Sequence, residues 1–358
     1  MRITKTVGQY LFGPGSFDHL DSVIDERRTP QTPAVAFFVD HYFSGKPLLD
    51  RLPKHDGDLV VLIDTTDEPT TDGIDTLTAQ VRDALGLPAA VVGIGGGATM
   101  DSAKAVSNLL ANPGKAEDFQ GWDLLPGPGV FKVGVPTLSG TGAEGSRTCV
   151  MMNARKNLKL GMNSDHTVFD RLVLDPDLTT TAPRDQYFYT GMDTYIHNVE
   201  SLSGHYRHGM ADAFARESLG LCREVFLGGD MQSETNREKL MIASYLGGSA
   251  IGNSYVGLVH PLSAGLSMVL HTHHCVGNCI VMNVMDEFYP AETEEFRRMV
   301  AAQGVSIPTG LCRDLPDSDI DRMYDATVIH AKPLANALGD DFLSVLTRDK
   351  VGQLFRRM

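Results

Sequence analysis

Up to about residue 180, the chain alternates between short hydrophobic runs and longer mixed segments. The runs are β-branched and aliphatic, and most are separated by helix-length segments such as 73–85 and 101–110. This alternation is typical of buried strands in a mostly parallel sheet whose two faces are covered by helices. The expected strands lie at 34–39, 59–63, 90–94, 131–135 and 172–174.

After Pro183 the pattern changes to one that predicts helices, for example over 210–226 and 233–247, divided by glycines and polar turns. The segment 175–184 is rich in turn residues and is the expected domain boundary. The sequence therefore predicts an α/β domain over residues 1–182 and an all-helical domain over residues 183–358. A chain of 358 residues that is 42% hydrophobic is long enough to give each domain its own core.

The charge balance excludes one class of partner. Thirty-one basic and 45 acidic residues give a net charge of −14 with histidine neutral. Binding to nucleic acid needs a basic surface that releases counterions from phosphates, so a nucleic-acid partner is not expected. An anionic substrate would need a local cluster of positive charge.

Cysteine usage and the start of the chain indicate a compartment. Five cysteines are an odd number and do not form a disulfide framework. The first residues, MRITKTVGQYLFGPG, lack the apolar core of a secretory signal, and no run approaches the ~18 apolar residues of a membrane helix. We expect a reduced, soluble, cytoplasmic protein without a membrane partner.

A glycine-rich turn, GIGGGATMD at 93–101, follows the strand that ends at Ile94 and precedes a helix. Gly93, Gly95 and Ala98 match the dinucleotide-binding pattern G-x-G-x-x-A, in which the backbone approaches a pyrophosphate at a helix N-terminus. Taken alone, the turn fits an ordinary tight connection equally well. A second turn of small residues, PTLSGTGAE at 136–144, also follows a strand, and open α/β sheets bind ligands at such ends. The pair favours a nucleotide site.

The acidic residue that binds the ribose is not where an ordinary dinucleotide fold has it. About 20 residues after the glycine turn the chain is loop-like, at 112–118. An acid instead ends the strand 34–39, at Asp40. A carboxylate there would accept hydrogen bonds from ribose hydroxyls and repel a 2′-phosphate, which favours NAD over NADP.

Eight of the twelve histidines lie after residue 180. Asp193 and His197 are four residues apart, so on a helix they would share one face, ~6 Å apart along the axis. Such a pair is usually no more than a hydrogen-bonded surface pair. His260 and His274 would lie ~21 Å apart on one unbroken helix, but the polar stretch 271–273 offers a place to turn. If the chain turns there, three imidazoles and one carboxylate could hold Zn²⁺ or Fe²⁺ with room for a substrate oxygen.

A second arrangement of metal ligands competes with this one. His271, His273 and His274 lie close in sequence to Cys275 and Cys279, and clusters of this kind bind structural zinc. The two cysteines, however, are four apart in an apolar segment, where small buried thiols are common.

Short motifs spread along most of the chain combine into a specific pattern. They are FGPG at 12–15, the turn at 93–101, the turn at 136–144, LDPDL at 174–178, TGMDTYIHNVES at 190–201, and His260 with HCVGN at 274–278. Together they resemble the iron-containing, or group III, alcohol dehydrogenases of the dehydroquinate-synthase-like superfamily.

The resemblance implies a Rossmann-like N-terminal domain, a helical C-terminal domain, bound NAD and one divalent metal ion, Fe²⁺ or Zn²⁺. Glu200 is then expected beside the metal ligands rather than among them. The implied metal ligands are Asp193, His197, His260 and His274. The implied NAD contacts are Asp40, Gly96, Gly97, Ala98, Thr137, Leu138, Thr141 and Lys159.

One departure from the family affects the chemistry. Many members carry a further histidine four residues after the position of His260, and here that position is Ala264. His271 is the candidate to supply a catalytic proton relay in its place.

The resemblance also narrows the expected activity. Segments 142–147 and 185–204 are similar to a branch of the family that acts on sugar acids, so the expected reaction is NAD- and metal-dependent oxidation of a primary alcohol. A general alcohol or polyol dehydrogenase and a lyase like dehydroquinate synthase are the alternatives, together with a non-catalytic protein that holds structural zinc. The lyase chemistry needs several Lys and Arg around a phosphate, and 185–204 contains neither.

The expected partner is a small sugar-acid or alcohol substrate, and a homodimer is one possible assembly.

Overall fold

The structure is a computed structural model that describes residues 4–358, so the first three residues of the predicted 1–182 domain lie outside it. Two compact units divide the chain between Ala182 and Pro183. Lys5–Ala182 forms the N-terminal unit, and Pro183–Met358 belongs to the helical unit.

The N-terminal unit is built on a six-stranded sheet of order β1-β9-β6-β4-β2-β3, in which every neighbouring pair is parallel. Five of these strands confirm the predicted ones to within a residue or so. The sixth, β1, was not predicted because it is a four-residue edge strand with little burial. The strands are β1 (Gln9–Phe12), β2 (Val35–Asp40), β3 (Leu59–Ile63), β4 (Ala90–Gly95), β6 (Lys132–Pro136) and β9 (Arg171–Leu174).

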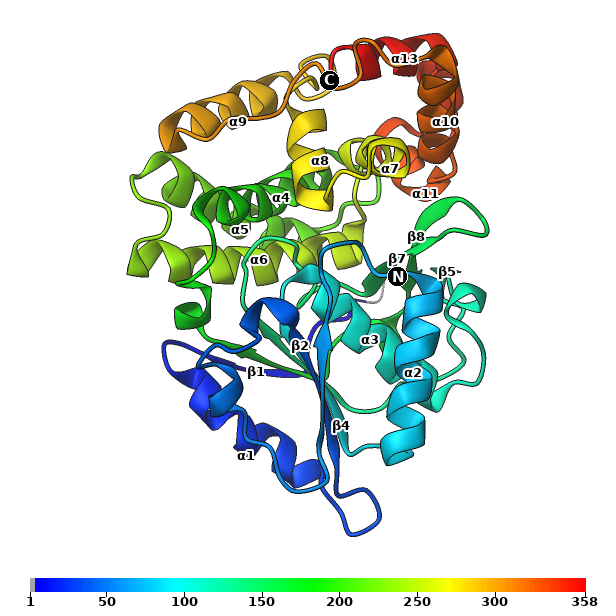
Figure 1. The fold of residues 1–358 in the computed structure, drawn as a ribbon. Coiled ribbons are helices and arrows are strands. Elements are labelled where there is room, and N and C mark those ends of the chain that lie inside the picture. The colour runs from blue at the N-terminus through cyan, green and yellow to red at the C-terminus, as the bar shows by residue number, and fades with distance from the viewer. Residues whose placement is uncertain (1–3) are drawn as a thin grey trace. The chain divides into compact units, whose positions relative to one another are not determined.

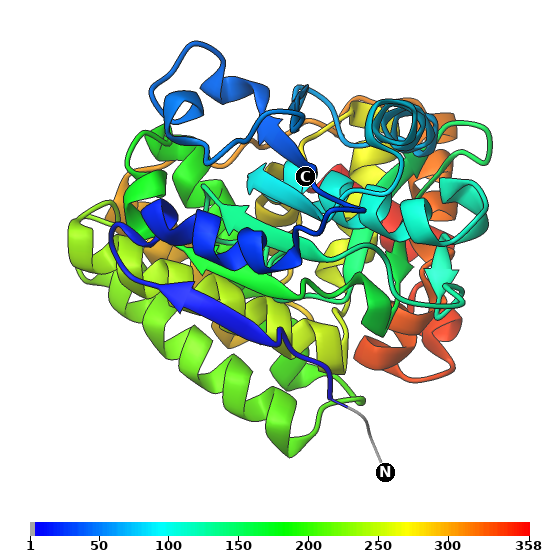
Figure 2. The same ribbon diagram turned by 90° about the horizontal axis from the view of Figure 1, so that it is seen from below.

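Both faces of this sheet are buried, as the hydrophobic runs predicted. Helix α1 (Leu20–Ile24) covers one face, and helices α2 (Thr71–Leu85) and α3 (Gly97–Ala111) cover the other (Figures 1 and 2). Alternate residues of β2 divide between the two cores: Val35, Phe37 and Val39 pack with α1, and Ala36 and Phe38 pack with α2 and α3. A strand that is apolar on both sides in this way must be internal.

A second, three-stranded sheet was missed by the sequence analysis. It has the order β5-β8-β7 and consists of β5 (Gly121–Trp122), β7 (Thr148–Asn153) and β8 (Leu158–Asn163). Strands β7 and β8 form an antiparallel hairpin in which buried and half-buried residues alternate along β7 and the first half of β8. Continuous apolar runs identify fully buried strands, so this half-buried hairpin, which carries Lys159, gave no such signal.

The second unit is all-helical over residues 183–358, which confirms the predicted fold class. Helix α4 packs against α5, α6 and α8, and most of its residues are buried, including polar ones. The helices are α4 (Arg184–Ser203), α5 (Gly209–Leu227), α6 (Glu234–Ser254), α7 (Val259–Leu270), α8 (His274–Met282), α9 (Pro290–Gln303), α10 (Asp317–Val328), α11 (Ala331–Leu338), α12 (Phe342–Val345) and α13 (Arg348–Arg356).

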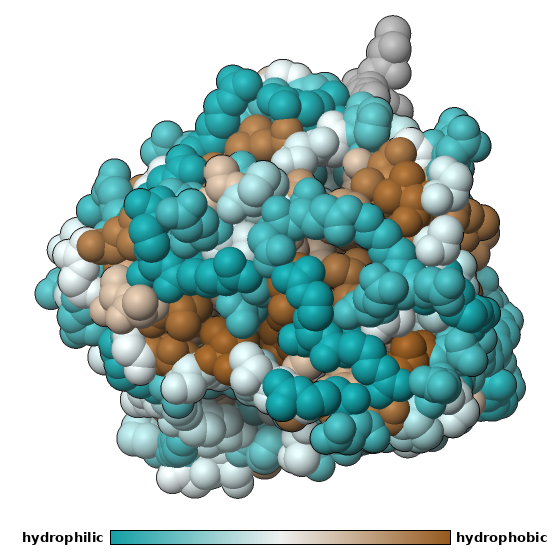
Figure 3. All heavy atoms as spheres, turned by 90° about the horizontal axis from the view of Figure 1, so that it is seen from above, coloured by the Kyte–Doolittle hydropathy of each residue, from teal (hydrophilic) through white to brown (hydrophobic). Residues whose placement is uncertain are grey.

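Apolar side chains also reach the surface. Figure 3 shows one face of the molecule, where hydrophobic areas lie separately between hydrophilic ones. Large exposed apolar side chains include Tyr10 and Phe12 in the N-terminal unit and Met210, Leu311 and Leu343 in the helical unit. Within residues 4–358, no helix combines the length and the apolarity needed to cross a bilayer.

A buried lysine ties helix α3 to the β7 strand. Lys104 is fully buried, and its Nζ donates to the carbonyl oxygens of Ser146 at 3.0 Å and Thr148 at 2.9 Å. One turn earlier, Asp101 Oδ2 accepts from the Val150 amide at 2.9 Å. Burial lowers the pKa of Lys104 and raises the pKa of Asp101 to about 6. The helix that follows the glycine turn is thereby fixed to the segment that follows the second small-residue turn.

Replacing Lys104 by Met should destabilise the N-terminal unit by about 1–3 kcal/mol, because the carbonyl oxygens of Ser146 and Thr148 lose their donor and Asp101 loses a nearby positive charge. The single tryptophan, Trp122, lies in β5 of the same unit, so its fluorescence in a urea titration measures the effect. The double variant Asp101→Asn/Lys104→Met should recover part of the loss. A Lys104→Met protein as stable as the wild type would show that the pair contributes nothing to folding.

Candidate functional site

Helix α4 places a carboxylate and an imidazole in the interior of the helical unit. Asp193 is fully buried and His197 is 2% exposed. Their four-residue spacing puts both on one helix face, and His197 Nε2 lies 3.6 Å from Asp193 Oδ1. An Asp/His pair with this spacing usually lies on the protein surface, whereas this pair is buried in the interior of the helical unit.

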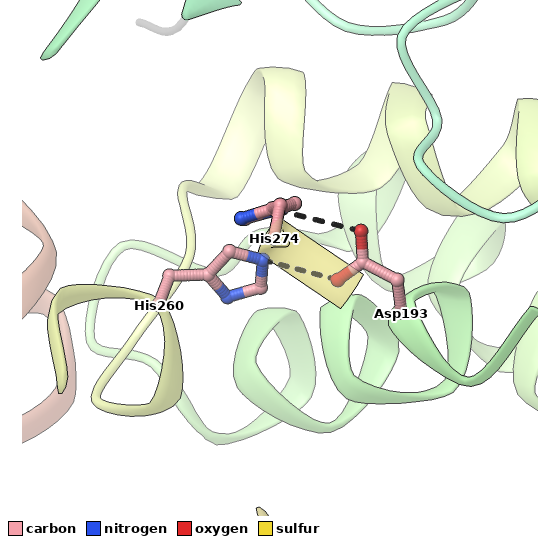
Figure 4. A group of neighbouring side chains, drawn as sticks. All are labelled: Asp193, His260 and His274. Atoms are coloured by element: carbon pink, nitrogen blue, oxygen red, sulfur yellow. Dashed lines mark ion pairs between the residues drawn. The ribbon is translucent and has the colours of Figure 1, made fainter. Parts of the chain in front are cut away.

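Two further histidines converge on the same carboxylate from other helices. His260 lies in the first turn of α7 and His274 at the start of α8. His260 Nε2 is 3.4 Å from Asp193 Oδ1, and His274 Nε2 is 3.5 Å from Asp193 Oδ2 (Figure 4). The ligand atoms of these three residues all lie within 4.8 Å of one another. The turn at 271–273 thus brings together residues that one continuous helix would separate.

His197 completes the group of four residues that the resemblance implied. Its ring stacks on that of His260, with centroids 4.8 Å apart and planes inclined by 16°. Its Nδ1 is buried and has no hydrogen-bond partner in the described part of the chain. Asp193, His197, His260 and His274 are called the ligand cluster below.

The electrostatics of the ligand cluster favour an ionised carboxylate. Burial opposes the charge on Asp193, but the surrounding histidines, His197 foremost, outweigh it and hold the pKa of Asp193 well below its usual range. Burial lowers the pKa of His197 to about 4, so this imidazole is neutral at pH 7. At His260, the carboxylates of Glu200 and Asp193 outweigh burial and raise the pKa to about 10. One carboxylate and three imidazole nitrogens are a donor set that Zn²⁺ and Fe²⁺ accept.

Glu200 lies behind His260 rather than among the atoms facing Asp193. It is fully buried on α4, its Oε1 accepts from the Val259 amide, and its Oε2 accepts from His260 Nδ1. A carboxylate on Nδ1 fixes the tautomer that leaves the Nε2 lone pair free for a metal ion. The structure therefore places Glu200 beside the ligand cluster, where the resemblance put it.

The competing Cys/His arrangement is not assembled. Within residues 4–358, the groups of three or more close potential metal ligands are the one around Asp193 and a surface group of Asp21, Asp25 and His55. Cys279 belongs to neither, and His271 and His273 are exposed. Cys275 is buried with its Sγ 3.7 Å from Asp193 Oδ2, so it packs beside the ligand cluster.

One residue of the site was given no role by the sequence. Asn278 is fully buried on α8, and its Nδ2 lies 2.6 Å from Asp193 Oδ1. It stands four residues after His274, the same spacing as Asp193 and His197, and this signal could have identified it.

In the N-terminal unit, the two small-residue turns face each other at the carboxyl ends of β4 and β6. The Thr137 amide donates to the Gly95 carbonyl oxygen at 3.0 Å. A Cβ added to Gly97 would lie 3.0 Å from the Thr141 side chain, and one added to Gly96 would lie 3.3 Å from Leu138. Small residues are therefore needed where these turns approach each other.

The first turn of α3 has no side-chain cap. The helix begins at Gly97, and Gly96 before it supplies no side-chain cap, so the amides of this turn, including that of Ala98, have no capping side chain. The buried hydroxyls of Thr99 and Ser139 have no hydrogen-bond partner in the described residues. Amides at a helix N-terminus that have no side-chain cap suit the pyrophosphate of a dinucleotide.

Asp40 lies at the end of β2, the strand next to β4. Its Cβ would be 3.0 Å from a Cβ added to Gly95, so it borders the glycine turn directly. Its Oδ1 accepts from the Tyr42 amide and from Thr65 Oγ1, both at 3.0 Å. Lys159 lies elsewhere, on β8, where its Nζ is 2.9 Å from Glu68 Oε1.

His271 is not part of the ligand cluster. It ends α7 in the left-handed conformation with φ of 53°, and its side chain is exposed. Ala264, the position at which a histidine was missing, is buried on the same helix.

Comparison with known proteins places the chain in a family. The family described as iron-containing alcohol dehydrogenase matches residues 8–176, and the C-terminal region of the Fe-containing alcohol dehydrogenase family matches residues 187–314. The chain belongs to the iron-containing alcohol dehydrogenase family.

Individual relatives are more distant. The chain is 31% identical over 211 residues to a sulfoacetaldehyde reductase of Bilophila wadsworthia, covering 58% of this chain and 54% of that protein. It is 29% identical over 250 residues to an NAD-dependent methanol dehydrogenase of Bacillus methanolicus, covering 68% of this chain and 63% of that protein. The matches thus span roughly half to two-thirds of these relatives' own lengths.

A solved structure supports the fold over the whole chain. The iron-containing alcohol dehydrogenase of Thermotoga maritima superposes with a TM-score of 0.80 and covers 99% of both chains at 22% identity. This likeness confirms the combination of a parallel-sheet domain with a helical domain.

Replacing His260 or His274 by Ala should strip most of the divalent metal from the protein after reconstitution with Fe²⁺ or Zn²⁺. NAD binding should keep a similar dissociation constant, because the turns at 93–101 and 136–144, where NAD is expected to bind, belong to the N-terminal unit. Elemental analysis measures the metal per chain, and His273→Ala, an exposed neighbour outside the ligand cluster, is the matched control. Near-full occupancy in both cluster variants, with the fold intact, would mean that the ligand set is wrong.

Replacing Asp40 by Ser should weaken NAD binding about tenfold or more, because a hydrogen bond to a charged group contributes about 1.5–3 kcal/mol. NADP binding should improve, since the charge that repels its 2′-phosphate is removed. Asp40→Asn isolates the charge while keeping the shape. Dissociation constants for both cofactors decide the matter, and an unchanged ratio would remove Asp40 from the ribose site.

Proposed function

We propose that the protein is an NAD- and metal-dependent dehydrogenase that interconverts a primary alcohol and its aldehyde. The observation that carries the proposal is the convergence of Asp193, His197, His260 and His274 from three helices in the interior of the helical unit. The Asp193/His197 pair, His260 and His274 are far apart in the sequence, so no local folding requirement brings the two later histidines to the pair. A shared divalent ion is the physical reason to bring them together.

Each part of the site has a separate task in this proposal. When bound, the metal ion supplies Lewis acidity toward the substrate hydroxyl, and the nicotinamide accepts the hydride. Asp193 and the three imidazoles hold the ion, and the single carboxylate leaves the site with a net positive charge. Glu200 orients His260, and the turns at 95–98 and 137–141 bind the dinucleotide, with Asp40 on the ribose. Lys159 is the remaining proposed NAD contact.

For the substrate, we propose the terminal primary alcohol of a sugar acid, specifically the C8 hydroxyl of 3-deoxy-D-manno-octulosonate (Kdo), a lipopolysaccharide sugar. The support is the similarity of segments 142–147 and 185–204 to the sugar-acid branch of the family. One relative is named a sulfoacetaldehyde reductase, and sulfoacetaldehyde, like a sugar acid, is an anionic substrate.

The arginines nearest these segments do not by themselves identify a carboxylate site. Arg147 is paired with Asp165 at 3.0 Å, and Arg207 is paired with Asp212 at 2.7 Å. His208 Nε2 lies 3.2 Å from the Asn253 carbonyl oxygen. A general alcohol dehydrogenase is therefore the second candidate.

The test is NADH formation by the protein reconstituted with Fe²⁺ or with Zn²⁺, using Kdo, 1-propanol, methanol and a polyol in parallel. We expect metal-dependent turnover that His260→Ala abolishes, and a higher kcat/KM for Kdo than for the simple alcohols. A preference for the simple alcohols would overturn the sugar-acid assignment and leave the dehydrogenase. Failure with every alcohol under both metals, or elimination of phosphate from a dehydroquinate-synthase substrate, would overturn the dehydrogenase itself.

The same assay examines His271 as the proton relay. His271→Asn retains a residue that tolerates the left-handed backbone conformation at the end of α7, so it removes the imidazole with little strain. Slower turnover with unchanged metal content would support the relay. Wild-type rates would leave His271 with a structural role alone.

A further inference from the structure

The side-chain amide of Asn278 lies at the point where the ligand cluster converges. Besides its 2.6 Å contact with Asp193 Oδ1, Nδ2 is 3.2 Å from His260 Nε2 and 3.2 Å from His274 Nε2. The residue is fully buried, and its Oδ1 has no hydrogen-bond partner among the residues described. Asp193 Oδ1 is an acceptor, so the NH₂ group of Asn278, and not its carbonyl oxygen, must face it.

The three contacts cannot all persist beside a bound cation. In the neutral form that binds a metal ion, each imidazole Nε2 has a single lone pair. An imidazole that gives this lone pair to a metal ion can no longer accept from Asn278. A carboxylate oxygen has two lone pairs, so Asp193 Oδ1 can accept from Asn278 and bind an ion at the same time.

We propose that Asn278 is a positioning residue that fixes the Asp193 carboxylate within the metal site through its Nδ2–Oδ1 hydrogen bond. The inference rests on the proposed function, because it assumes that Asp193 is a metal ligand. Asp193 gains from such a bond because it is buried, and the hydrogen bond replaces water that would otherwise stabilise its charge. Helix geometry makes the arrangement rigid: Asn278 and His274 lie one turn apart on α8, so the ligand and the positioning residue move together.

Metal affinity tests the proposal without relying on activity. Residues that orient metal ligands typically contribute 10–100-fold to affinity, so Asn278→Leu and Asn278→Ser should each weaken Zn²⁺ binding by about that factor in a competition titration with a chelator. The two variants change the side-chain volume differently, so an equal loss in both assigns the effect to the amide. If Asn278→Leu does not fold, Asn278→Ser carries the test.

Asn198 provides a matched control on α4. It is also fully buried with an unpartnered Oδ1, but its Nδ2 donates to Ser218 Oγ at 2.7 Å rather than to a metal ligand. Asn198→Leu should therefore leave Zn²⁺ affinity unchanged. A similar loss in both asparagine variants would indicate a general effect of buried amides and would overturn the proposal.

A double-mutant cycle with Asp193→Asn shows whether Asn278 acts through Asp193. In the Asp193→Asn background, adding Asn278→Leu should cost little further Zn²⁺ affinity, because the interaction is already lost. Full additivity, wild-type affinity in the single variant, or tighter binding in it would each overturn the proposal. Failure of the wild-type protein to bind any divalent ion would instead overturn the proposed function, which keeps the two outcomes distinct.

Discussion

The burial of one carboxylate constrains how three helices of the helical unit pack together. Asp193 is fully buried on α4, and removing a charge from water costs several kcal/mol unless neighbouring groups compensate for it. Its compensation comes from His197 on the same helix, from His260 on α7, and from His274 and Asn278 on α8. The packing of these three helices is therefore tied to a polar interior, and any rearrangement that separates them leaves an unpaired charge.

A second buried carboxylate, that of Glu200, contacts the other side of His260 and so extends this network to the start of α7. Glu200 follows Asp193 on the same stripe of α4 and accepts from the Val259 amide and His260 Nδ1. His260 thus lies between two carboxylates, which explains its raised pKa. Because Glu200 also binds the backbone at the start of α7, it fixes where that helix begins as well as the orientation of its histidine.

Sequence patterns were reliable where burial is complete and contacts are local. The runs at 35–39 and 90–94 are apolar on both faces, so the parallel strands were predictable, whereas the half-buried β7–β8 hairpin and the edge strand β1 were not. Asp193 and His197 were predictable as a pair because one helix face sets their spacing. The approach of His260 and His274 depends on the turn at 271–273, which no spacing rule specifies, and there the family resemblance supplied the ligand set.

The position of Asp40 shows why the spacing rule for the ribose-binding acid does not apply to this chain. The acid still ends the strand that lies beside the glycine turn. The rule that an acid follows the glycine turn by about 20 residues assumes that the next strand in the chain is also the neighbour in the sheet. Here the strand beside β4 on that side is β2, which precedes it in the chain. The carboxylate still ends the strand adjacent to the glycine turn, because parallel strands bring their carboxyl ends to one edge of the sheet. Strand order, rather than distance along the sequence, therefore determines which acid borders the glycine turn at this edge.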